Sequence, residues 1–555
     1  MSAGPLLNIE DLSVALPEGA DRRFAVQGVS LPLGRREVLC VVGESGSGKS
    51  VLANTVMGLL PAPALRVAGG RIMFDGQELT RLPEESYREL RGRRISMIFQ
   101  EPMTALNPVL TIGEQIEEVL AAHGMADRRT RRERALELLA AMHLPDPPSL
   151  LGAYPFRLSG GQRQRVMIAA ALALEPEILI ADEPTTALDV TTQKQILRLI
   201  REIQERRRLS VLFITHDFGV VADIADKVAV MQHGSLVEYG VAAKVLDAPE
   251  HPYTQRLIAA VRRLEDGAED ARPVAAAEPL LEIKGLRKTY RSASGFFGLR
   301  KREVRAVDDV TLTIHQGETV GLVGESGSGK TTLGQLVVRL LPADGGELAF
   351  RGQEIRTARG ARLLGLRKSI QMVFQDPFAS LNPRHRVGRI LTETPIRHGV
   401  TPAQAATRAR ELLHLVGLDV GAYDRFPHEF SGGQRQRIAI ARALALDPEL
   451  VVADEPVSAL DVSVQAQVLE LLADLRRRLN LSMLFITHDL RVASRICDRI
   501  AVMRGGVIVE IGSTRQIFGD PQHEYTRGLL DSIPGRSWLG IGGGAPVADR
   551  ATMTL

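Results

Sequence analysis

Short runs of apolar residues, each about as long as a β-strand, recur along the chain. Val38–Val42 and Thr319–Val323 each lead directly into the glycine-rich segment GESGSGK, which is followed by an apolar stretch with helical spacing. Glu177–Ala181 and Glu449–Ala453 are also largely apolar, without alternation of polar residues. Strands of a parallel sheet that is covered on both faces have this continuous character. The pattern therefore predicts an α/β fold built on a mainly parallel core sheet.

Two further pairs of strands are expected from the same pattern. Val211–Ile214 and Met483–Ile486 each end in Thr-His-Asp. The apolar runs SMIF and QMVF end just before Gln100 and Gln375. Polar side chains at the carboxyl ends of parallel strands meet at one edge of a sheet, where ligands of α/β proteins bind.

The chain contains the same series of motifs twice, in the same order. VVGESGSGKS begins at Val41 and returns as LVGESGSGKT at Leu322, and SGGQRQR begins at Ser159 and again at Ser431. Solenoid repeats have periods of about 20–50 residues, so a repeat this long indicates a duplicated domain. The residues between the two copies carry charges, alanines and one proline without apolar periodicity, as a flexible connector does. The predicted organisation is a first domain over 1–264, a linker over 265–279, a second domain over 280–533 and a tail over 534–555 that we expect to be disordered.

Composition narrows the class of protein. The chain has 555 residues, of which 45% are hydrophobic and 24% charged, which excludes disorder as its main state. Basic and acidic residues nearly balance, 69 against 66, so nucleic acid is not expected as the main partner. The two cysteines, Cys40 and Cys497, are too few for a disulfide framework, a zinc site or an iron–sulfur ligand set. We expect no membrane span and no secretory signal, and therefore a cytoplasmic chain.

The glycine-rich segments match the P-loop pattern, in which backbone N–H groups surround phosphates at the start of a helix. Lys49 and Lys330 are expected to reach the β- and γ-phosphate oxygens of ATP, and Ser50 and Thr331 to bind Mg²⁺. A glycine-rich turn without function is the alternative. Two matches, each between a buried strand and a helix, disfavour it. The glycines that shape the loops are Gly43, Gly46, Gly48, Gly324, Gly327 and Gly329.

Carboxylate pairs follow the next strands. Asp182 and Asp454 suit Mg²⁺ binding, and Glu183 and Glu455 are candidates to orient and polarise an attacking water. A helix N-cap at a strand exit is the alternative reading of these carboxylates.

His216 and His488, at the ends of the strands before Asp217 and Asp489, are candidates for holding the γ-phosphate. A hydrogen-bonded structural histidine is the alternative, which the matching positions in both halves disfavour.

The combination resembles the ATP-binding cassette ATPases, and the segments that separate them from other P-loop proteins are LSGGQ at 158–162 and FSGGQ at 430–434. The resemblance implies an ATP hydrolase whose two tandem domains each add an antiparallel β subdomain and a helical subdomain, here near 88–172 and 366–444. It implies that Gln100 and Gln375 touch Mg²⁺ and water. It also implies that the loops 187–189 and 459–461 lie where the two halves meet.

The SGGQ segments have a physical logic of their own, because a serine and two glycines that open a helix present backbone donors to an anion. In the family this second phosphate clamp acts across the dimer. The resemblance implies that Ser431, Gly432, Gly433 and Gln434 close over ATP held by Lys49, and that Ser159, Gly160, Gly161 and Gln162 close over ATP held by Lys330. ATP then favours the closed pair, and hydrolysis reopens it.

The two halves differ at one expected contact. Tyr290 stands where the family places an aromatic ring against adenine, whereas Leu16 holds the matching position in the first half, with Phe24 nearby. We expect both sites to hydrolyse ATP, since each keeps its lysine, glutamine, aspartate, glutamate and histidine.

The segments after each cassette, HPYT at 251–254 and HEYT at 523–526, resemble the C-terminal extension of dipeptide, oligopeptide, nickel and glutathione importer ATPases. A surface turn and helix without substrate information is the alternative. The resemblance implies two transmembrane permease subunits, an extracytoplasmic solute-binding protein and a peripheral location on the cytoplasmic face of the plasma (inner) membrane. Because neither segment contains a cysteine cluster, no iron–sulfur centre is expected, which brings the chain closer to fused glutathione- or microcin-type importers.

Several assignments stay open. The loops 103–108 and 378–383 either dock permease helices or are ordinary loops, and the extra residues 291–302 are either functional or only a longer hairpin tip. A twin-cassette translation factor is the alternative function, although the short, proline-broken connector disfavours it. The transported solute, whether peptide, glutathione, microcin-like peptide or nickel, is not determined by these motifs.

Overall fold

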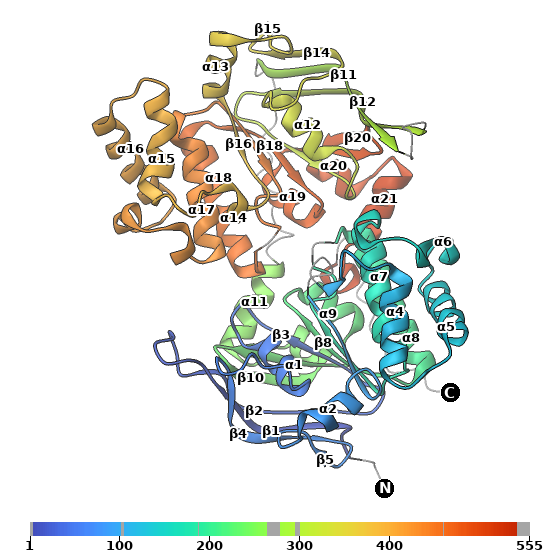
Figure 1. Ribbon diagram of the computed structural model, residues 1–555. Helices are drawn as coiled ribbons and strands as arrows, with labels where there is room; N and C mark the ends of the chain where they lie inside the picture. The colour runs from blue at the N-terminus through green and yellow to red at the C-terminus, as the bar shows by residue number, and fades with distance from the viewer. Residues whose placement is uncertain are drawn as a thin grey trace. The chain divides into compact units, whose positions relative to one another are not determined.

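The computed structural model describes residues 4–100, 105–186, 188–262, 278–294, 300–458 and 460–540 (Figure 1). The chain divides into two compact units. Residues up to Leu188, Thr192–Val261 and Pro534–Leu539 form the first unit, and Asp189–Thr191 and Arg262–Ile533 belong to the second. We call the two units the first and the second cassette. Most of the predicted linker lies outside the described residues.

The core of the first cassette is the predicted, mainly parallel sheet. Its order is β10 (Ser235–Val241), β9 (Lys227–Gln232), β3 (Val38–Val42), β8 (Ser210–Thr215), β7 (Ile178–Asp182) and β6 (Ile95–Ile98). Only the β9–β10 pair is antiparallel. Every residue of β3, β7 and β8 is buried, as the continuous apolar runs predict.

An antiparallel sheet packs against this core. Its order is β2 (Phe24–Leu33), β1 (Leu7–Ala15), β4 (Arg66–Phe74) and β5 (Gln77–Glu78). Ile9 and Phe74 of this sheet share one hydrophobic core with Val41 of β3, Ile180 of β7 and Leu52 of α1 (Lys49–Val56). A helical region holds α4 (Ile112–Ala122), α5 (Arg128–Ala141), α6 (Pro147–Leu151) and α7 (Gly160–Ala171).

The second cassette repeats this plan. Its core sheet runs β16 (Ile370–Val373), β17 (Leu450–Asp454), β18 (Ser482–Thr487), β13 (Thr319–Val323), β19 (Arg499–Arg504) and β20 (Val507–Ser513), and its antiparallel sheet runs β12 (Arg300–His315), β11 (Pro279–Ser294), β14 (Gly345–Phe350) and β15 (Gln353–Glu354). Its helical region contains α15 (Val387–Arg397), α16 (Pro402–Leu415) and α17 (Gly432–Ala443). The predicted fold class is confirmed, antiparallel and helical subdomains included.

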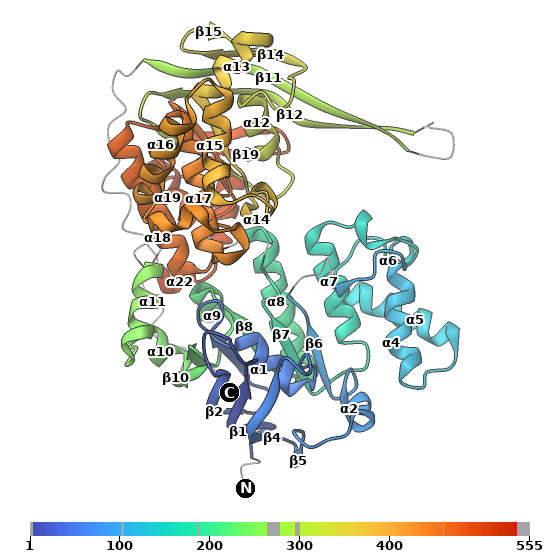
Figure 2. The same cartoon turned by 60° about the vertical axis from the view of Figure 1, so that its left-hand side comes forward.

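The two cassettes differ most in strand length at the β11–β12 hairpin. These strands have 16 residues each, against 9 in β1 and 10 in β2. Figure 2 shows the hairpin projecting as an arm from the rest of its cassette. Its ends carry part of the predicted extra segment 291–302, of which residues 295–299 lie outside the described part of the chain.

The end of the chain contributes to the first cassette. The backbone N–H of Gly535 donates to Asp223 Oδ2 at 3.1 Å, and Trp538 Nε1 donates to Asp247 Oδ1 at 3.1 Å. The short helix α22 (Arg536–Leu539) lies in this segment. The rest of the predicted tail, residues 541–555, lies outside the described residues, where the expectation of disorder stays a prediction. Among the described helices, none has the length and apolar character that crossing a membrane requires.

Candidate nucleotide-binding sites

The first P-loop joins β3 to α1 and is held by close backbone packing. Gly48 has φ 100°, and a Cβ there would lie 2.4 Å from the carbonyl oxygen of Ala25. A Cβ at Gly43 would lie 2.2 Å from the carbonyl oxygen of Met231. Only glycine therefore fits these two positions. Gly46 also has a positive φ, 75°.

The P-loop lysines are buried and point back into their own loops. Lys49 Nζ donates to the carbonyl oxygens of Gly43, at 2.8 Å, and Glu44, at 2.9 Å. Lys330 Nζ donates to Gly324 and Glu325, both at 2.7 Å. Burial lowers the pKa of Lys330. A buried ammonium among carbonyl oxygens is a point charge suited to a phosphate.

Each hydroxyl after the lysine pairs with the aspartate at the end of the neighbouring strand. Ser50 Oγ donates to Asp182 Oδ1 at 3.0 Å, and Thr331 Oγ1 donates to Asp454 Oδ1 at 3.2 Å. Burial raises the pKa of Asp182 and of Asp454 to about 6, although these hydrogen bonds oppose the shift. Mg²⁺ binds through one or two protein oxygens together with substrate phosphates and water, and this donor set fits it. No cluster of three His, Cys, Asp or Glu side chains able to hold a metal occurs among the described residues.

Glu183 is the centre of a side-chain cluster in the first cassette. Its Oε2 accepts hydrogen bonds from Gln100 Nε2 at 3.0 Å and from Thr186 Oγ1 at 3.0 Å, and its Oε1 lies 3.4 Å from His216 Nδ1. Burial raises the pKa of Glu183, but the hydrogen bond and charge of His216, helped by Lys49, outweigh it and lower the pKa to about 2. Glu183 is therefore ionised at neutral pH.

The second cassette builds the same cluster around Glu455. Gln375 Nε2 donates to its Oε2 at 2.9 Å, and His488 Nδ1 lies 3.3 Å from its Oε1. Burial opposes the lower pKa of Glu455, and His488 outweighs burial. Burial likewise opposes the raised pKa of His488, and Glu455 outweighs it.

The backbone of both glutamates is unusual. Glu183 has φ 45° and Glu455 has φ 44°, in the left-handed region that residues other than glycine rarely adopt. Their backbone N–H groups donate to the carbonyl oxygens of Ile214, at 3.0 Å, and Ile486, at 2.9 Å. Strain of this kind gathers at functional sites. No sequence pattern signals it, because neither residue is a glycine.

The SGGQ segments begin helices α7 and α17, as predicted. Ser159 and Gln162 form a capping box, in which the side chain of each accepts the backbone N–H of the other, at 3.3 and 3.0 Å. Ser431 and Gln434 form the same box, at 3.4 and 3.1 Å. The second glycine of each segment packs tightly, since a Cβ would lie 2.4 Å from Thr192 Cγ2 at Gly161 and 2.3 Å from Val464 Cγ1 at Gly433.

The β1–β2 and β11–β12 hairpins differ near the P-loops. Tyr290 lies opposite Val304 in the hairpin of the second cassette, with 42% of its surface exposed. In the first cassette Arg22, for which no sequence pattern predicts a role, donates from Nη2 to the carbonyl oxygen of Gly46 in the P-loop. The guanidinium of Arg23 lies 5.0 Å from the centre of the Phe24 ring.

Two predicted pairs of loops lie only partly within the described residues. Ala187 and Ala459, the first residues of the predicted contact loops 187–189 and 459–461, lie outside the described residues. So do residues 101–104, which include the start of the loop 103–108.

Two family models match parts of the chain. A family model described as ABC transporter matches residues 26–186 and 307–458. A second model, described as the C-terminal region of oligopeptide/dipeptide transporters, matches residues 237–285 and 509–538.

Relatives of similar length match nearly the whole chain. The glutathione import ATP-binding protein GsiA of Shigella sonnei (strain Ss046) and that of Escherichia coli (strain K12) are each 47% identical over 568 residues, covering 96% of this chain and 90% of theirs. Among solved structures, the dimeric post-hydrolysis state of the ATP-binding cassette MJ0796 bound to ADP and Pi is 29% identical. It covers 42% of this chain and 98% of its own, with a TM-score of 0.39.

Proposed function

This chain belongs to the ABC transporter family, and on that premise we propose that it is the ATP-hydrolysing subunit of an importer for peptides or peptide-like solutes such as glutathione. The observation that carries the ATPase part is the repeated cluster of a P-loop lysine, an aspartate, a glutamate, a glutamine and a histidine in both cassettes. The import part is supported by the two C-terminal regions of oligopeptide/dipeptide transporter type and by the relatives named for glutathione import.

The proposed chemistry assigns one task to each side chain. Lys49 and Lys330 bind the β- and γ-phosphates, while Ser50 with Asp182 and Thr331 with Asp454 would hold Mg²⁺. The ion, when bound, neutralises charge on the phosphate oxygens. Gln100 and Gln375 orient the attacking water and contact the ion.

Glu183 and Glu455, which are ionised at neutral pH, accept the proton of that water. His216 and His488 hold each glutamate in place through the Nδ1 contact, which leaves Nε2 to face the γ-phosphate.

We further propose that each SGGQ segment serves the nucleotide of the other cassette, as in the related ATPases. The proposal is supported by the capping boxes, which order the first turns of α7 and α17 so that their N–H groups can face an anion. Tyr290 is the proposed adenine contact of the second cassette.

The proposed partners are two transmembrane permease subunits and an extracytoplasmic solute-binding protein, with this chain peripheral to the cytoplasmic face of the plasma (inner) membrane. The absence of a membrane-crossing helix from the described residues is consistent with separate permeases. No observation favours the ribosome-associated alternative.

The experiment is reconstitution of the chain with its permease subunits in lipid vesicles. ATP hydrolysis is measured after adding the binding protein loaded with glutathione, an oligopeptide or nickel. We expect peptide or glutathione to stimulate hydrolysis severalfold over the unloaded protein, and Glu183→Gln with Glu455→Gln to abolish the stimulated rate. Failure of every solute to stimulate, together with co-sedimentation of the chain with ribosomes, would refute the importer proposal.

A further inference from the structure

A tyrosine of each C-terminal segment touches the P-loop of its own cassette. Tyr253 lies at the start of α11 (Pro252–Arg262), and its hydroxyl accepts the backbone N–H of Glu44 at 3.2 Å. Tyr525 lies in α21 (Glu524–Asp531), and its hydroxyl accepts the backbone N–H of Glu325 at 3.2 Å. The two contacts have the same donor, acceptor and length, although they arise in separate cassettes.

Glu44 and Glu325 are also the residues that bind the P-loop lysines. The carbonyl oxygen of Glu44 accepts Lys49 Nζ at 2.9 Å, and that of Glu325 accepts Lys330 Nζ at 2.7 Å. A single residue of each P-loop is thus fixed at its N–H by a tyrosine while its C=O holds the lysine. Rotation of that residue would move the lysine.

The segment around each tyrosine is itself held by matching contacts. The N–H of Tyr253 donates to His251 Nδ1 at 3.2 Å, and the N–H of His251 donates to Glu238 on β10 at 3.2 Å. In the second cassette the backbone N–H of Tyr525 donates to His523 Nδ1 at 3.1 Å, and the backbone N–H of His523 donates to Glu510 on β20 at 3.1 Å. In both HPYT and HEYT the histidine therefore holds the backbone of the tyrosine, and the tyrosine contacts the P-loop.

Both tyrosine rings are packed against other groups of their cassette. Tyr253 is 3% exposed. Tyr525 is partly buried, and the guanidinium of Arg504 lies 4.8 Å from its ring centre. Replacement by phenylalanine keeps the ring and removes the hydroxyl, and with it the hydrogen bond to the P-loop.

We propose that Tyr253 and Tyr525 are positioning residues for ATP binding, which hold Glu44 and Glu325 so that Lys49 and Lys330 are presented to the phosphates. The C-terminal segments are then parts of the nucleotide sites and not only appendages to the cassettes. The proposal rests on the nucleotide sites proposed above.

The test is the full chain carrying Tyr253→Phe and Tyr525→Phe. Loss of one neutral hydrogen bond per site predicts a KM for ATP that rises about fivefold, with a smaller change in kcat. The thermal unfolding temperature without nucleotide should fall only slightly, since each cassette loses one hydrogen bond, while the increase that ATP produces becomes smaller. Tyr239→Phe is the matched control, because the Tyr239 hydroxyl donates to Pro32 on β2 rather than to the P-loop.

Two results would overturn the proposal. One is an unchanged KM and an unchanged ATP-induced stabilisation in the phenylalanine variant. The other is a lower unfolding temperature without nucleotide while KM stays constant, which makes the tyrosines merely structural. Lys49→Ala with Lys330→Ala distinguishes this failure from failure of the nucleotide sites, since those variants lose ATP binding if the sites are correct and keep it if they are not.

Discussion

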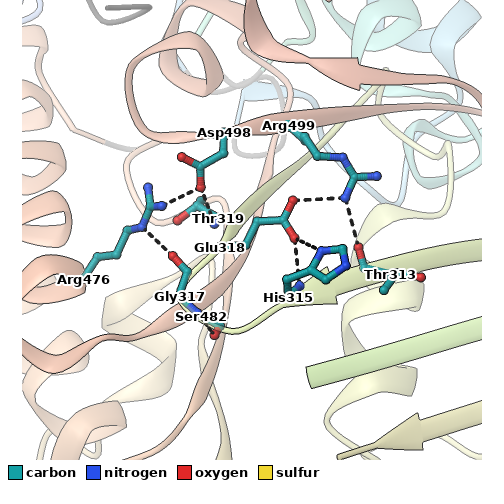
Figure 3. Close-up of polar contacts among 9 residues, drawn as sticks. All are labelled: Thr313, His315, Gly317, Glu318, Thr319, Arg476, Ser482, Asp498 and Arg499. Atoms are coloured by element: carbon teal, nitrogen blue, oxygen red, sulfur yellow. Dashed lines mark hydrogen bonds and ion pairs between the residues drawn. The ribbon is translucent and has the colours of Figure 1, made fainter. Parts of the chain in front are cut away.

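The two cassettes share the contacts of the P-loop lysine, the aspartate, the glutamine and the histidine at the proposed nucleotide sites, but differ at the opposite end of the central strands. In the second cassette Glu318, whose side chain is 1% exposed, pairs with Arg499 at 3.0 Å and with His315 at 2.9 Å (Figure 3). Arg476 of α18 (Val462–Leu479) pairs with the buried Asp498 at 2.5 Å.

At the corresponding positions the first cassette has a lysine and a glutamine in place of the two arginines, and a more exposed ion pair. Glu37, at the position of Glu318, pairs with Lys227 at 2.9 Å. Gln204 of α8 (Val190–Arg207) donates to the carbonyl oxygen of Arg36 at 2.7 Å, a backbone contact that Arg476 makes in the second cassette. Asp226, at the position of Asp498, pairs with Arg201, and the two side chains are 39% and 40% exposed. The comparison teaches that the duplicated chain is constrained where phosphates are expected and free to change where only stability is involved.

The largest expected effect concerns the P-loop lysines, whose contacts both cassettes share. Lys49→Ala and Lys330→Ala should each weaken ATP binding in their own cassette by about 100-fold, because charge-assisted hydrogen bonds contribute about 1.5–3 kcal/mol each. Titration calorimetry of the full chain checks this, with the exposed Lys244→Ala as control. Strongly unequal losses would break the equivalence of the two sites.

The next effect sharpens the difference between the cassettes. Arg476→Ala leaves Asp498 buried without its partner and should cost about 3 kcal/mol. Arg201→Ala removes a half-exposed pair and should cost less than about 1 kcal/mol. Hydrogen exchange of the β13 and β3 amides measures the two changes separately. Equal acceleration in both variants would contradict the distinction.

A smaller effect concerns the contact between Tyr290 and the adenine base of ATP. Tyr290→Leu should weaken ATP binding by about 1 kcal/mol, the lower end for a stacked ring, since Tyr290 is partly exposed. Inorganic triphosphate has no base, so its binding should not change. If Leu16→Tyr strengthens the first site for ATP alone, the asymmetry between the hairpins is explained.

The smallest effect is a pH dependence common to both cassettes. Because the pKa of Asp182 and of Asp454 is raised to about 6, protons compete with Mg²⁺ for these carboxylates below that pH. The Mg²⁺ concentration for half-maximal hydrolysis should therefore rise severalfold as pH falls from 7 to 5.5.

The terminal phosphate of ATP also titrates near this range, so the control is the Asp182→Asn, Asp454→Asn variant. It should keep only the part of the pH dependence that belongs to the phosphate. An identical pH dependence in the two proteins would exclude the aspartates as its source.

The sequence predicted the fold, and it placed the candidate site residues at strand ends and helix starts, because those features depend on local patterns. The strands β3 and β13 coincide with the predicted runs, and Ser159 and Ser431 cap helices that begin at the next residue. The left-handed glutamates, the Arg22 contact and the Tyr253 contact could not be read in this way. Tyr253 and Glu44 are 209 positions apart, and only the folded sheet brings them together.

The central claim is that Glu183 and Glu455 are the proton acceptors of two hydrolytic sites. Its most direct test is steady-state ATP hydrolysis by the chain carrying Glu183→Gln and Glu455→Gln, with ATP binding measured on the same sample. The account predicts retained binding and a turnover lowered by at least about 100-fold, the contribution of a general base. Turnover equal to that of the parent chain, with ATP bound normally, would contradict it.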